Sequence, residues 1–248
     1  MSHQPTVVRV RTATLEIACE VSGPERGTPV ILLHGFPDDP RTWDRVAAHL
    51  SRAGYRTIAP YLRGYGPTRF LDEHTLRSGQ QAALGHDLLA LMDGLGIQRA
   101  VLAGYDWGGR AGLAANRREF CKLLWRLWSP NWRFDDATYE RTAASFDNPD
   151  FVDVVIHSYR HRFGWAPGDP SLEPSEERLA ARPRIGVPTV VLHGGSDGVA
   201  PADSSAGHAR FFSGPYVRRV IPEAGHFLAW EAPDAIVEAV RELVPEPN

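Results

Sequence analysis

The 248-residue sequence predicts an α/β protein built on a doubly wound, mostly parallel sheet. Short continuous apolar runs, which are typical of buried parallel strands, alternate with segments whose apolar residues recur at helical spacing. Several of these runs also stop at a glycine-rich polar motif: PVILL at HGFP, RAVLAG at YDWGG, and VPTVVL at HGGSDG. Strands that alternate with helices in this way favour a parallel sheet covered by helices on both faces.

The strands are expected in the two halves of the chain that flank its middle section. The first two have β-branched residues in partial alternation, which indicates a half-exposed antiparallel pair. In chain order the expected strands are Thr6–Arg11, Thr14–Val21, Pro29–Leu33, Arg56–Ala59, Arg99–Gly104, Val187–Leu192 and Tyr216–Ile221. Helical spacing of apolar residues predicts helices at Pro40–Ala53, Thr75–Leu95, Glu119–Trp128 and Phe227–Leu243.

The middle section, rich in Trp, Arg, Asp and Pro, differs in composition from the rest. Its segment NPDFVDVVIHSYRHR contains the run VDVVIH, which has β propensity, but its start favours a helix. Asn148 suits the N-cap, Pro149 the first helical position and Asp150 the positive end of the helix dipole. A loop is expected at Trp165–Pro174. The chain is therefore divided into core residues 1–118, a helical cap at 119–184 and core residues 185–248.

Bulk composition excludes some classes of function. A net charge of −3 gives no electrostatic case for binding nucleic acid or an anionic membrane. Two isolated cysteines, Cys19 and Cys121, fit a reducing compartment, and neither a signal peptide nor a membrane-spanning run is visible. We expect a cytoplasmic monomer or homodimer without cofactor or metal. His157 and His161 stand four residues apart, but no further ligands accompany them, so helix-surface positions are favoured.

The motif GYDWGG suggests chemistry when it is taken together with three others. After a strand and before a helix, it is typical of a sharp turn, here called the elbow, that lifts its central residue, Asp106, above the sheet. An isolated motif of this kind is more often a turn aspartate that caps a helix. Here HGFP, Asp197 in HGGSDG and His226 in PEAGHF also follow strands. Along the chain Asp106, Asp197 and His226 follow the order of a nucleophile, an acid and a histidine.

The motifs HGFPD, RGYGPT, GYDWGG, HGGSDGVAP and GHF resemble the epoxide hydrolase branch of the α/β-hydrolase superfamily. The resemblance covers 6–118 and 184–244, most of the chain. It implies that Asp106 attacks an sp3 carbon of a small hydrophobic organic substrate and forms an ester. His226 would then activate the water that cleaves the ester, and Asp197 would orient the imidazole.

The resemblance implies further site residues. Backbone N–H groups of Phe36 and Trp107 would stabilise an oxyanion, with His34 in the same HGFP turn. In this family cap tyrosines donate hydrogen bonds to the emerging alkoxide. Tyr159 resembles the later of these tyrosines, although packing of an amphipathic tyrosine on a cap helix is an equal alternative. Tyr139 is the candidate for the earlier tyrosine.

Haloalkane and haloacetate dehalogenases are near relatives that also use an aspartate nucleophile. In such an enzyme Trp107 would serve as a halide-binding N–H donor. Asp197 follows the late strand, as in epoxide hydrolases, whereas haloalkane dehalogenases often carry their acid one strand earlier. A third alternative is an inactive truncated hydrolase.

The chain departs from the superfamily after the elbow. The family continues through a long apolar helix and another central strand before its cap, whereas GYDWGGRAG runs directly into the polar sequence LAANRRE. The hypothesis is that a segment containing the end of the elbow helix, one central strand and the first part of the cap is missing near Arg110–Leu113. The sheet must then close around the gap, a helix must refold from Ala111–Trp128, or a partner must cover the site.

Overall fold

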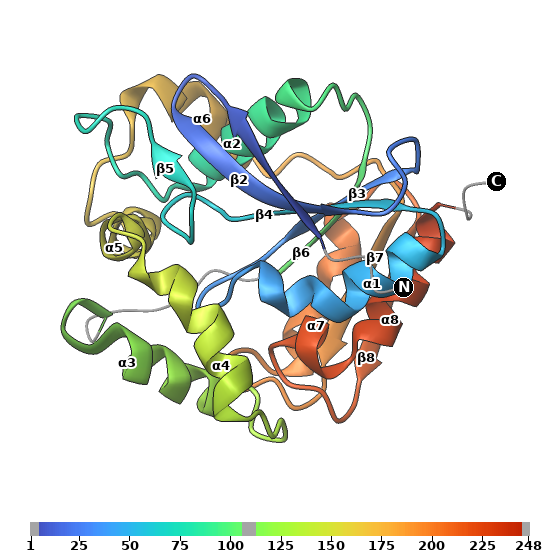
Figure 1. Cartoon of the computed structure of the whole chain (residues 1–248). Coiled ribbons are helices and arrows are strands. Elements are labelled where there is room, and N and C mark those ends of the chain that lie inside the picture. Colours follow the sequence, from blue (N-terminus) through green and yellow to red (C-terminus); the bar gives the residue numbers. More distant parts are fainter. Residues whose placement is uncertain (1–4, 106–112, 245–248) are drawn as a thin grey trace.

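The computed structural model, which describes residues 5–105 and 113–244, contains a sheet of mixed direction (Figure 1). Its order is β1-β2-β4-β3-β6, with β5 paired to β2. The strands are β1 (Thr6–Arg11), β2 (Leu15–Ser22), β3 (Pro29–Leu33), β4 (Arg56–Pro60), β5 (Arg69–Phe70) and β6 (Val101–Gly104). β3 is parallel to both β4 and β6, while β1 and β2 are antiparallel. The predicted doubly wound α/β fold is confirmed, with a sheet of mixed direction in which β2 runs antiparallel to its neighbours.

Helices cover both faces of this sheet because the side chains of β3 alternate in direction. Val30 and Leu32 pack with helices α1 (Asp44–Arg52) and α8 (Pro233–Leu243). Ile31 points to the opposite face and packs with Leu91 of helix α2 (Gln81–Gly94). Figure 1 shows α1 and α8 on one side of the sheet and α2 on the other.

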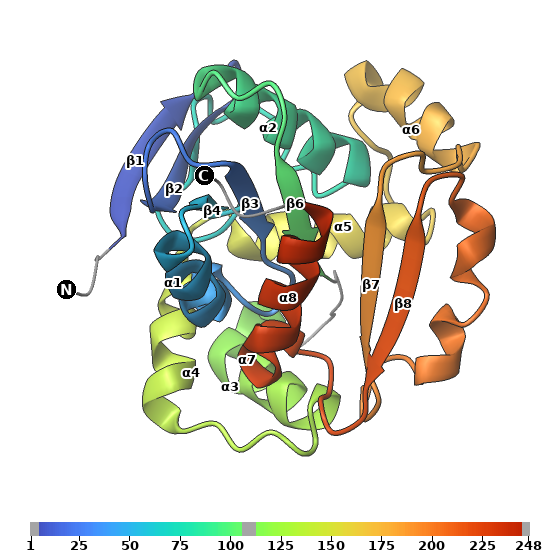
Figure 2. The same ribbon diagram turned by 90° about the vertical axis from the view of Figure 1, so that its right-hand side faces the viewer.

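The sheet is interrupted beyond β6. Strands β7 (Thr189–Gly194) and β8 (Tyr216–Ile221) form a separate parallel pair, shown beside β6 in Figure 2. In the part of the chain that the structure describes, no strand lies between β6 and β7, and α8 packs against both. This arrangement agrees with the expectation that one central strand is absent.

The handedness of the connections predicts on which face of the sheet a segment absent after β6 would lie. Right-handed crossovers place α1 on one face as the chain moves from β3 to β4, and α2 on the other as it moves from β4 to β6. A helix leading onward from β6 would lie beside α2. On that face Leu102 is 52% exposed, although the residue paired with it, Ile31, is fully buried. A cavity of about 590 Å³, lined by leucines and by charged side chains such as Arg63 and Asp87, opens between α2 and the ends of β3 and β6.

Four helices form the section between the two sheets: α3 (Leu113–Trp128), α4 (Asp136–Ala143), α5 (Phe151–Arg162) and α6 (Glu173–Ala180). Helix α3 begins six residues before the predicted start at Glu119. Its start is close to Ala111, where the alternative of a refolded helix was expected to begin. The predicted helix in NPDFVDVVIHSYRHR is confirmed, but it starts at Phe151. The side chain of Asn148 instead anchors this section to the core, because its amide donates to the carbonyls of Gly66 and Thr68.

Three other predicted boundaries differ from those in the structure. Helix α2 starts at Gln81 rather than Thr75, because the chain passes so close to α5 that a Cβ on Gly79 would lie 2.3 Å from the carbonyl oxygen of Val154. The predicted loop 165–174 contains the 3-10 turn 170–172 and the first residues of α6. The predicted helix 227–243 breaks at Ala232, where the following Pro233 disfavours helical backbone, into α7 (Leu228–Glu231) and α8.

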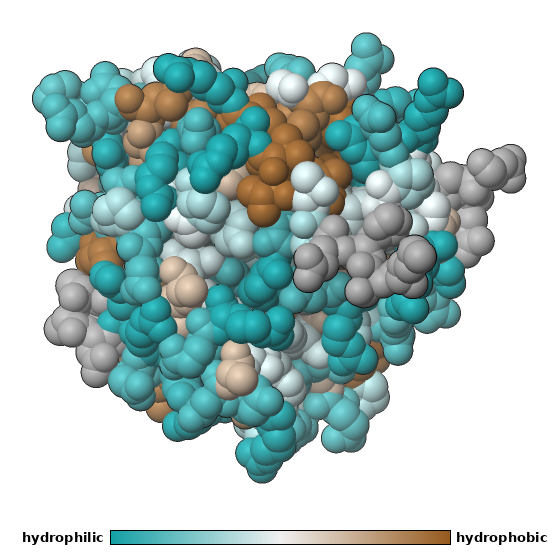
Figure 3. Space-filling model, viewed as in Figure 1, coloured by the Kyte–Doolittle hydropathy of each residue, from teal (hydrophilic) through white to brown (hydrophobic). Residues whose placement is uncertain are grey.

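The surface in Figure 3 is mainly hydrophilic, with apolar side chains gathered in its upper part, where Figure 1 draws α2 and β2. Among the described residues, Val7 of β1 and Leu89 of α2 are each more than half exposed. None of the described helices is both long and apolar enough to cross a membrane. These two apolar side chains therefore lie on the sheet edge and on an outward helix face.

A matched pair of substitutions tests the interrupted sheet. Leu32 of β3 is fully buried, whereas Leu102 on the neighbouring strand is half exposed. We expect Leu32→Ala to lower the free energy of unfolding by about 2–5 kcal/mol and Leu102→Ala by less than about 1 kcal/mol. Urea denaturation followed by tryptophan fluorescence measures both. A loss at Leu102 as large as that at Leu32 would show that another element covers β6.

Candidate active site

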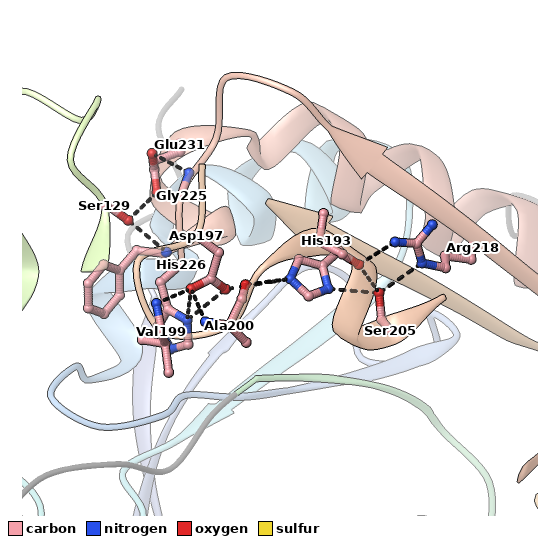
Figure 4. Close-up of polar contacts among 12 residues, drawn as sticks. Ser129, His193, Asp197, Val199, Ala200, Ser205, Arg218, Gly225, His226 and Glu231 are labelled. Carbon is pink, nitrogen blue, oxygen red and sulfur yellow. Dashed lines mark hydrogen bonds and ion pairs between the residues drawn. The ribbon is translucent and has the colours of Figure 1, made fainter. Parts of the chain in front are cut away.

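An acid and a histidine from the second sheet are paired at its carboxyl end (Figure 4). Asp197 follows β7 by three residues, and His226 follows β8 by five. The Nδ1–H group of His226 donates to the Asp197 carboxylate, with distances of 3.1 Å to Oδ1 and 3.0 Å to Oδ2. The structure therefore brings together two of the predicted catalytic residues, with Nδ1 of the imidazole facing the acid.

Asp197 is held in its ionised form. Burial opposes ionisation, but hydrogen bonding and the charge of His226 outweigh it, together with the backbone N–H groups of Val199 and Ala200, so the pKa of Asp197 lies below its usual value. These two N–H groups donate to Oδ1 at 2.7 and 3.2 Å. A carboxylate fixed from two sides orients the imidazole and stabilises its protonated form.

A second histidine supports the turn that carries Asp197. His193, on β7, donates from Nε2 to the carbonyl of Ala200 at 3.0 Å, and its Nδ1 lies 2.8 Å from the hydroxyl oxygen of Ser205. Arg218 of β8 donates to the same hydroxyl oxygen (Figure 4). The acid turn is thus tied to both strands of the second sheet.

Aromatic rings connect the histidine to the cap. The ring of Trp128 lies 5.3 Å from His226 and 6.3 Å from Phe36, measured between centroids. The ring centroid of Tyr159, on α5, lies 6.4 Å from that of Phe36, and the Tyr159 hydroxyl oxygen is buried. The structure therefore places the predicted cap tyrosine beside the predicted oxyanion residue, in an aromatic cluster that reaches the histidine through Trp128.

His34 links the ends of two strands. It donates from Nδ1 to the carbonyl of Gly35 at 3.0 Å, and its Nε2 accepts the backbone N–H of Leu62 at 3.2 Å. Complete burial lowers the pKa of His34 to about 4, which keeps the ring neutral near pH 7. Both ring nitrogens bond to the protein backbone, which gives His34 a structural role at the ends of the two strands, and its part in substrate binding stays a prediction.

Tyr139 is also used within the protein. Its hydroxyl donates to the carbonyl of Arg118, and its ring packs on Trp125 at 5.2 Å. Burial raises its pKa far above the usual value. Tyr139 therefore fastens α4 to α3, and its hydroxyl proton is committed to that contact.

Asp106 and Trp107 lie outside the described residues, but the residue before them is well placed. Tyr105 follows the end of β6, and its ring lies 6.3 Å from His226 and 6.4 Å from Phe227. The end of the elbow strand and the histidine loop are therefore adjacent, even though their strands belong to different sheets.

A buried pair of acids next to the elbow was missed by the sequence analysis. The hydroxyl of Tyr105 donates to Asp38 at 2.5 Å, and Trp230 Nε1 donates to the same oxygen at 3.0 Å. Asp39 accepts the hydroxyl of Ser145. Burial raises the pKa of Asp38 to about 7 and, with a contribution from the Asp38 charge, raises that of Asp39 as well. Two adjacent acids directly after HGFP were the available signal.

No metal site is found among the described residues, where no group of three histidine, cysteine or acidic side chains could hold an ion. His157 accepts the backbone N–H of Gly79 at 3.1 Å and donates to the carbonyl of Pro167 at 3.0 Å. Burial lowers its pKa. His157 thus joins the loop before α2 to the loop after α5, where sequence analysis favoured a simple surface position.

Asp38 predicts a dependence of stability on pH. Because its pKa is about 7 in the fold and about 3.8 when unfolded, its stabilising contribution is complete below pH 4 and is lost as pH rises through 7. Between pH 5 and 8 the free energy of unfolding should fall by about 3 kcal/mol more in the wild type than in Asp38→Asn. Urea titrations across this range measure the difference, which also cancels the opposite contribution of His34. Parallel pH profiles would contradict the assignment.

Comparison with known proteins agrees with this geometry. A family model described as the alpha/beta hydrolase fold matches residues 28–119. An epoxide hydrolase from Caballeronia sordidicola is 35% identical over 142 residues, which are 56% of this chain and 43% of that protein. Epoxide hydrolase 3 from Siraitia grosvenorii is 44% identical over 82 residues, 33% of this chain and 25% of the relative. The chain thus spans less than half the length of these curated relatives.

Solved structures extend the similarity along the chain. The crystal structure of a candidate epoxide hydrolase from Klebsiella pneumoniae is 36% identical, with a TM-score of 0.91 over 96% of this chain and 97% of that one. An α/β hydrolase from Nostoc, 17% identical with a TM-score of 0.79, shares the fold. The paired acid and histidine, the strand order and these similarities lead to one conclusion: the chain belongs to the α/β-hydrolase superfamily and is epoxide hydrolase-like.

Proposed function

We propose that the protein opens epoxides, or similar sp3-carbon electrophiles, through an ester on Asp106 that water then hydrolyses. The observation that carries the proposal is the Asp197–His226 pair, which lies next to the end of the elbow strand. An acid–histidine pair serves many hydrolases, but an aspartate at the elbow position selects attack on an sp3 carbon. The names of the similar proteins supply the same reaction class.

In the first step an Asp106 carboxylate oxygen attacks an epoxide carbon. A C–O bond forms to the enzyme, the epoxide C–O bond breaks, and its electron pair becomes an alkoxide that takes a proton from Tyr159. A phenol suits this part because it is protonated near neutral pH. The position of Tyr159 beside Phe36 supports the assignment.

In the second step His226 removes a proton from water, and the resulting hydroxide attacks the ester carbonyl carbon. The backbone N–H groups of Phe36 and Trp107 stabilise the oxyanion. Collapse of this intermediate breaks the bond between the carboxyl carbon of Asp106 and the substrate oxygen, and that oxygen takes the proton of the newly added hydroxyl group. The diol leaves, Asp106 is again a carboxylate, and the proton on His226 returns to the phenolate of Tyr159. Water and epoxide are consumed in equal amounts and no other reactant is needed.

Trapping the ester tests the proposal. In His226→Gln the first step should proceed and the second should stop, because no base activates water. After incubation with a styrene oxide-type epoxide, mass spectrometry should locate the added substrate on Asp106. Haloalkanes and haloacetates form the comparison arm. Chloride release by the wild type, without diol formation from epoxides, would identify a dehalogenase instead.

The interrupted sheet favours a competing interpretation in which the chain is a non-catalytic remnant. The same experiment separates the two. A cooperative thermal transition would show that the His226→Gln protein is folded. If this folded protein forms no adduct with any substrate, the covalent mechanism is wrong and the remnant interpretation stands.

The two cap tyrosines provide a matched test of the acid. Tyr159→Phe removes the proposed proton donor and should lower the rate of epoxide opening by about 10²-fold. Tyr139→Phe removes a hydroxyl that bonds to the Arg118 carbonyl, so it should cost about 1 kcal/mol of stability and leave the rate unchanged. Single-turnover kinetics and urea denaturation measure these effects. Equal loss of rate in both variants would contradict the acid role of Tyr159.

A further inference from the structure

The end of helix α3 holds both loops that carry the acid–histidine pair. The carbonyl oxygen of Trp128 accepts the backbone N–H of Gly198 at 2.9 Å and that of His226 at 3.1 Å. Gly198 directly follows Asp197. One carbonyl oxygen therefore fixes the backbone of the histidine itself and the backbone next to the acid, although the two loops are 29 residues apart in sequence.

The next residue of this turn forms a second attachment to the histidine loop. The hydroxyl of Ser129 donates to Glu231 Oε1 at 2.5 Å, and its oxygen accepts the backbone N–H of Phe227 at 3.1 Å. Glu231 Oε2 accepts the backbone N–H of Gly225 at 2.8 Å. Ser129 and Glu231 together thus bind the residues on both sides of His226, as Figure 4 shows for Ser129, Gly225 and Glu231.

The two glycines let α3 approach this closely. A Cβ on Gly198 would lie 2.1 Å from the carbonyl oxygen of Leu127, and a Cβ on Gly225 would lie 2.6 Å from Cα of Ser129. Ser129 itself is fully buried. Backbone contact of this kind leaves little freedom for either loop. A change at Ser129 or Glu231 therefore removes contacts to the residues on both sides of His226.

We propose that Ser129 and Glu231 are positioning residues for His226, and that with the Trp128 carbonyl they hold the imidazole in the orientation that ester hydrolysis requires. The proposal rests on the proposed function. The two steps should be affected differently, because His226 acts in the second step and not in the attack of Asp106 on the epoxide. Loss of the contact should therefore slow hydrolysis of the ester and spare its formation.

The experiment compares the wild type with Ser129→Ala and Glu231→Gln. The second variant keeps the shape of the side chain, but only one of its two terminal atoms can still accept a hydrogen bond. Rapid quenching with a styrene oxide-type epoxide, followed by intact-protein mass spectrometry, measures the fraction of enzyme carrying the ester. We expect the ester to accumulate in both variants, with its hydrolysis slowed at least about tenfold and its formation changed less than about threefold.

Glu242→Gln is the matched control, because Glu242 makes a similar short contact with Arg219 on the exposed surface. It should leave both steps unchanged. If the Ser129 and Glu231 variants slow both steps equally, or neither, the positioning role is wrong. Thermal unfolding followed by tryptophan fluorescence shows which variants are folded, and Glu231→Gln decides the question where Ser129→Ala does not fold.

A spectroscopic readout separates this proposal from the proposed function. The Nδ1 proton of His226, bonded to Asp197, is expected at low field in the proton NMR spectrum of the wild type. It should exchange rapidly with water in Ser129→Ala and Glu231→Gln but not in Glu242→Gln. If no protein forms an ester, including His226→Gln, the proposed function fails, and loss of this protection still supports the positioning role. Unchanged protection in both variants would overturn it.

Discussion

The break in the sheet between β6 and β7 is the constraint on which the rest of this structure depends. In an unbroken parallel sheet, ladder hydrogen bonds hold the elbow strand at a fixed distance from the strands that carry the acid and the histidine. Here β6 pairs with β3, and β7 pairs with β8, so no such ladder joins the two groups within residues 5–105 and 113–244. Helix packing and side-chain contacts must set their relative position.

Two kinds of contact do this. Helix α8 packs its apolar side against both β6 and β7, which fixes the two sheets through a shared core. The short helix α7 adds polar contacts from two consecutive residues: Trp230 donates to Asp38 beside the elbow, and Glu231 accepts from Ser129 at the end of α3. Because Asp38 also accepts the hydroxyl of Tyr105, polar contacts link the end of the elbow strand to α7, which in turn bonds to the histidine loop.

Sequence reasoning succeeded where the signal was local. Apolar runs gave the strands, and motifs at strand ends located Asp197 and His226, because the carboxyl ends of parallel strands meet at one edge of a sheet. It failed where long-range contact decides. Ser129 and Glu231 are 102 residues apart, and nothing near either predicts their bond. His34 and Tyr139 have the residue types of binding groups, but their polar atoms are taken by backbone partners that only the fold reveals.

The interrupted sheet also separates the requirements of catalysis from those of stability. The proposed chemistry needs three loops in a fixed geometry, and those loops are attached to one another by α7, α3 and the Asp38 contacts rather than by a described strand between β6 and β7. The exposed face of β6 and the cavity beside α2 instead reduce the apolar area that folding buries. A chain that lacks a central strand is therefore expected to lose stability first, and to lose the alignment of its acid and histidine only when the contacts around α7 also fail.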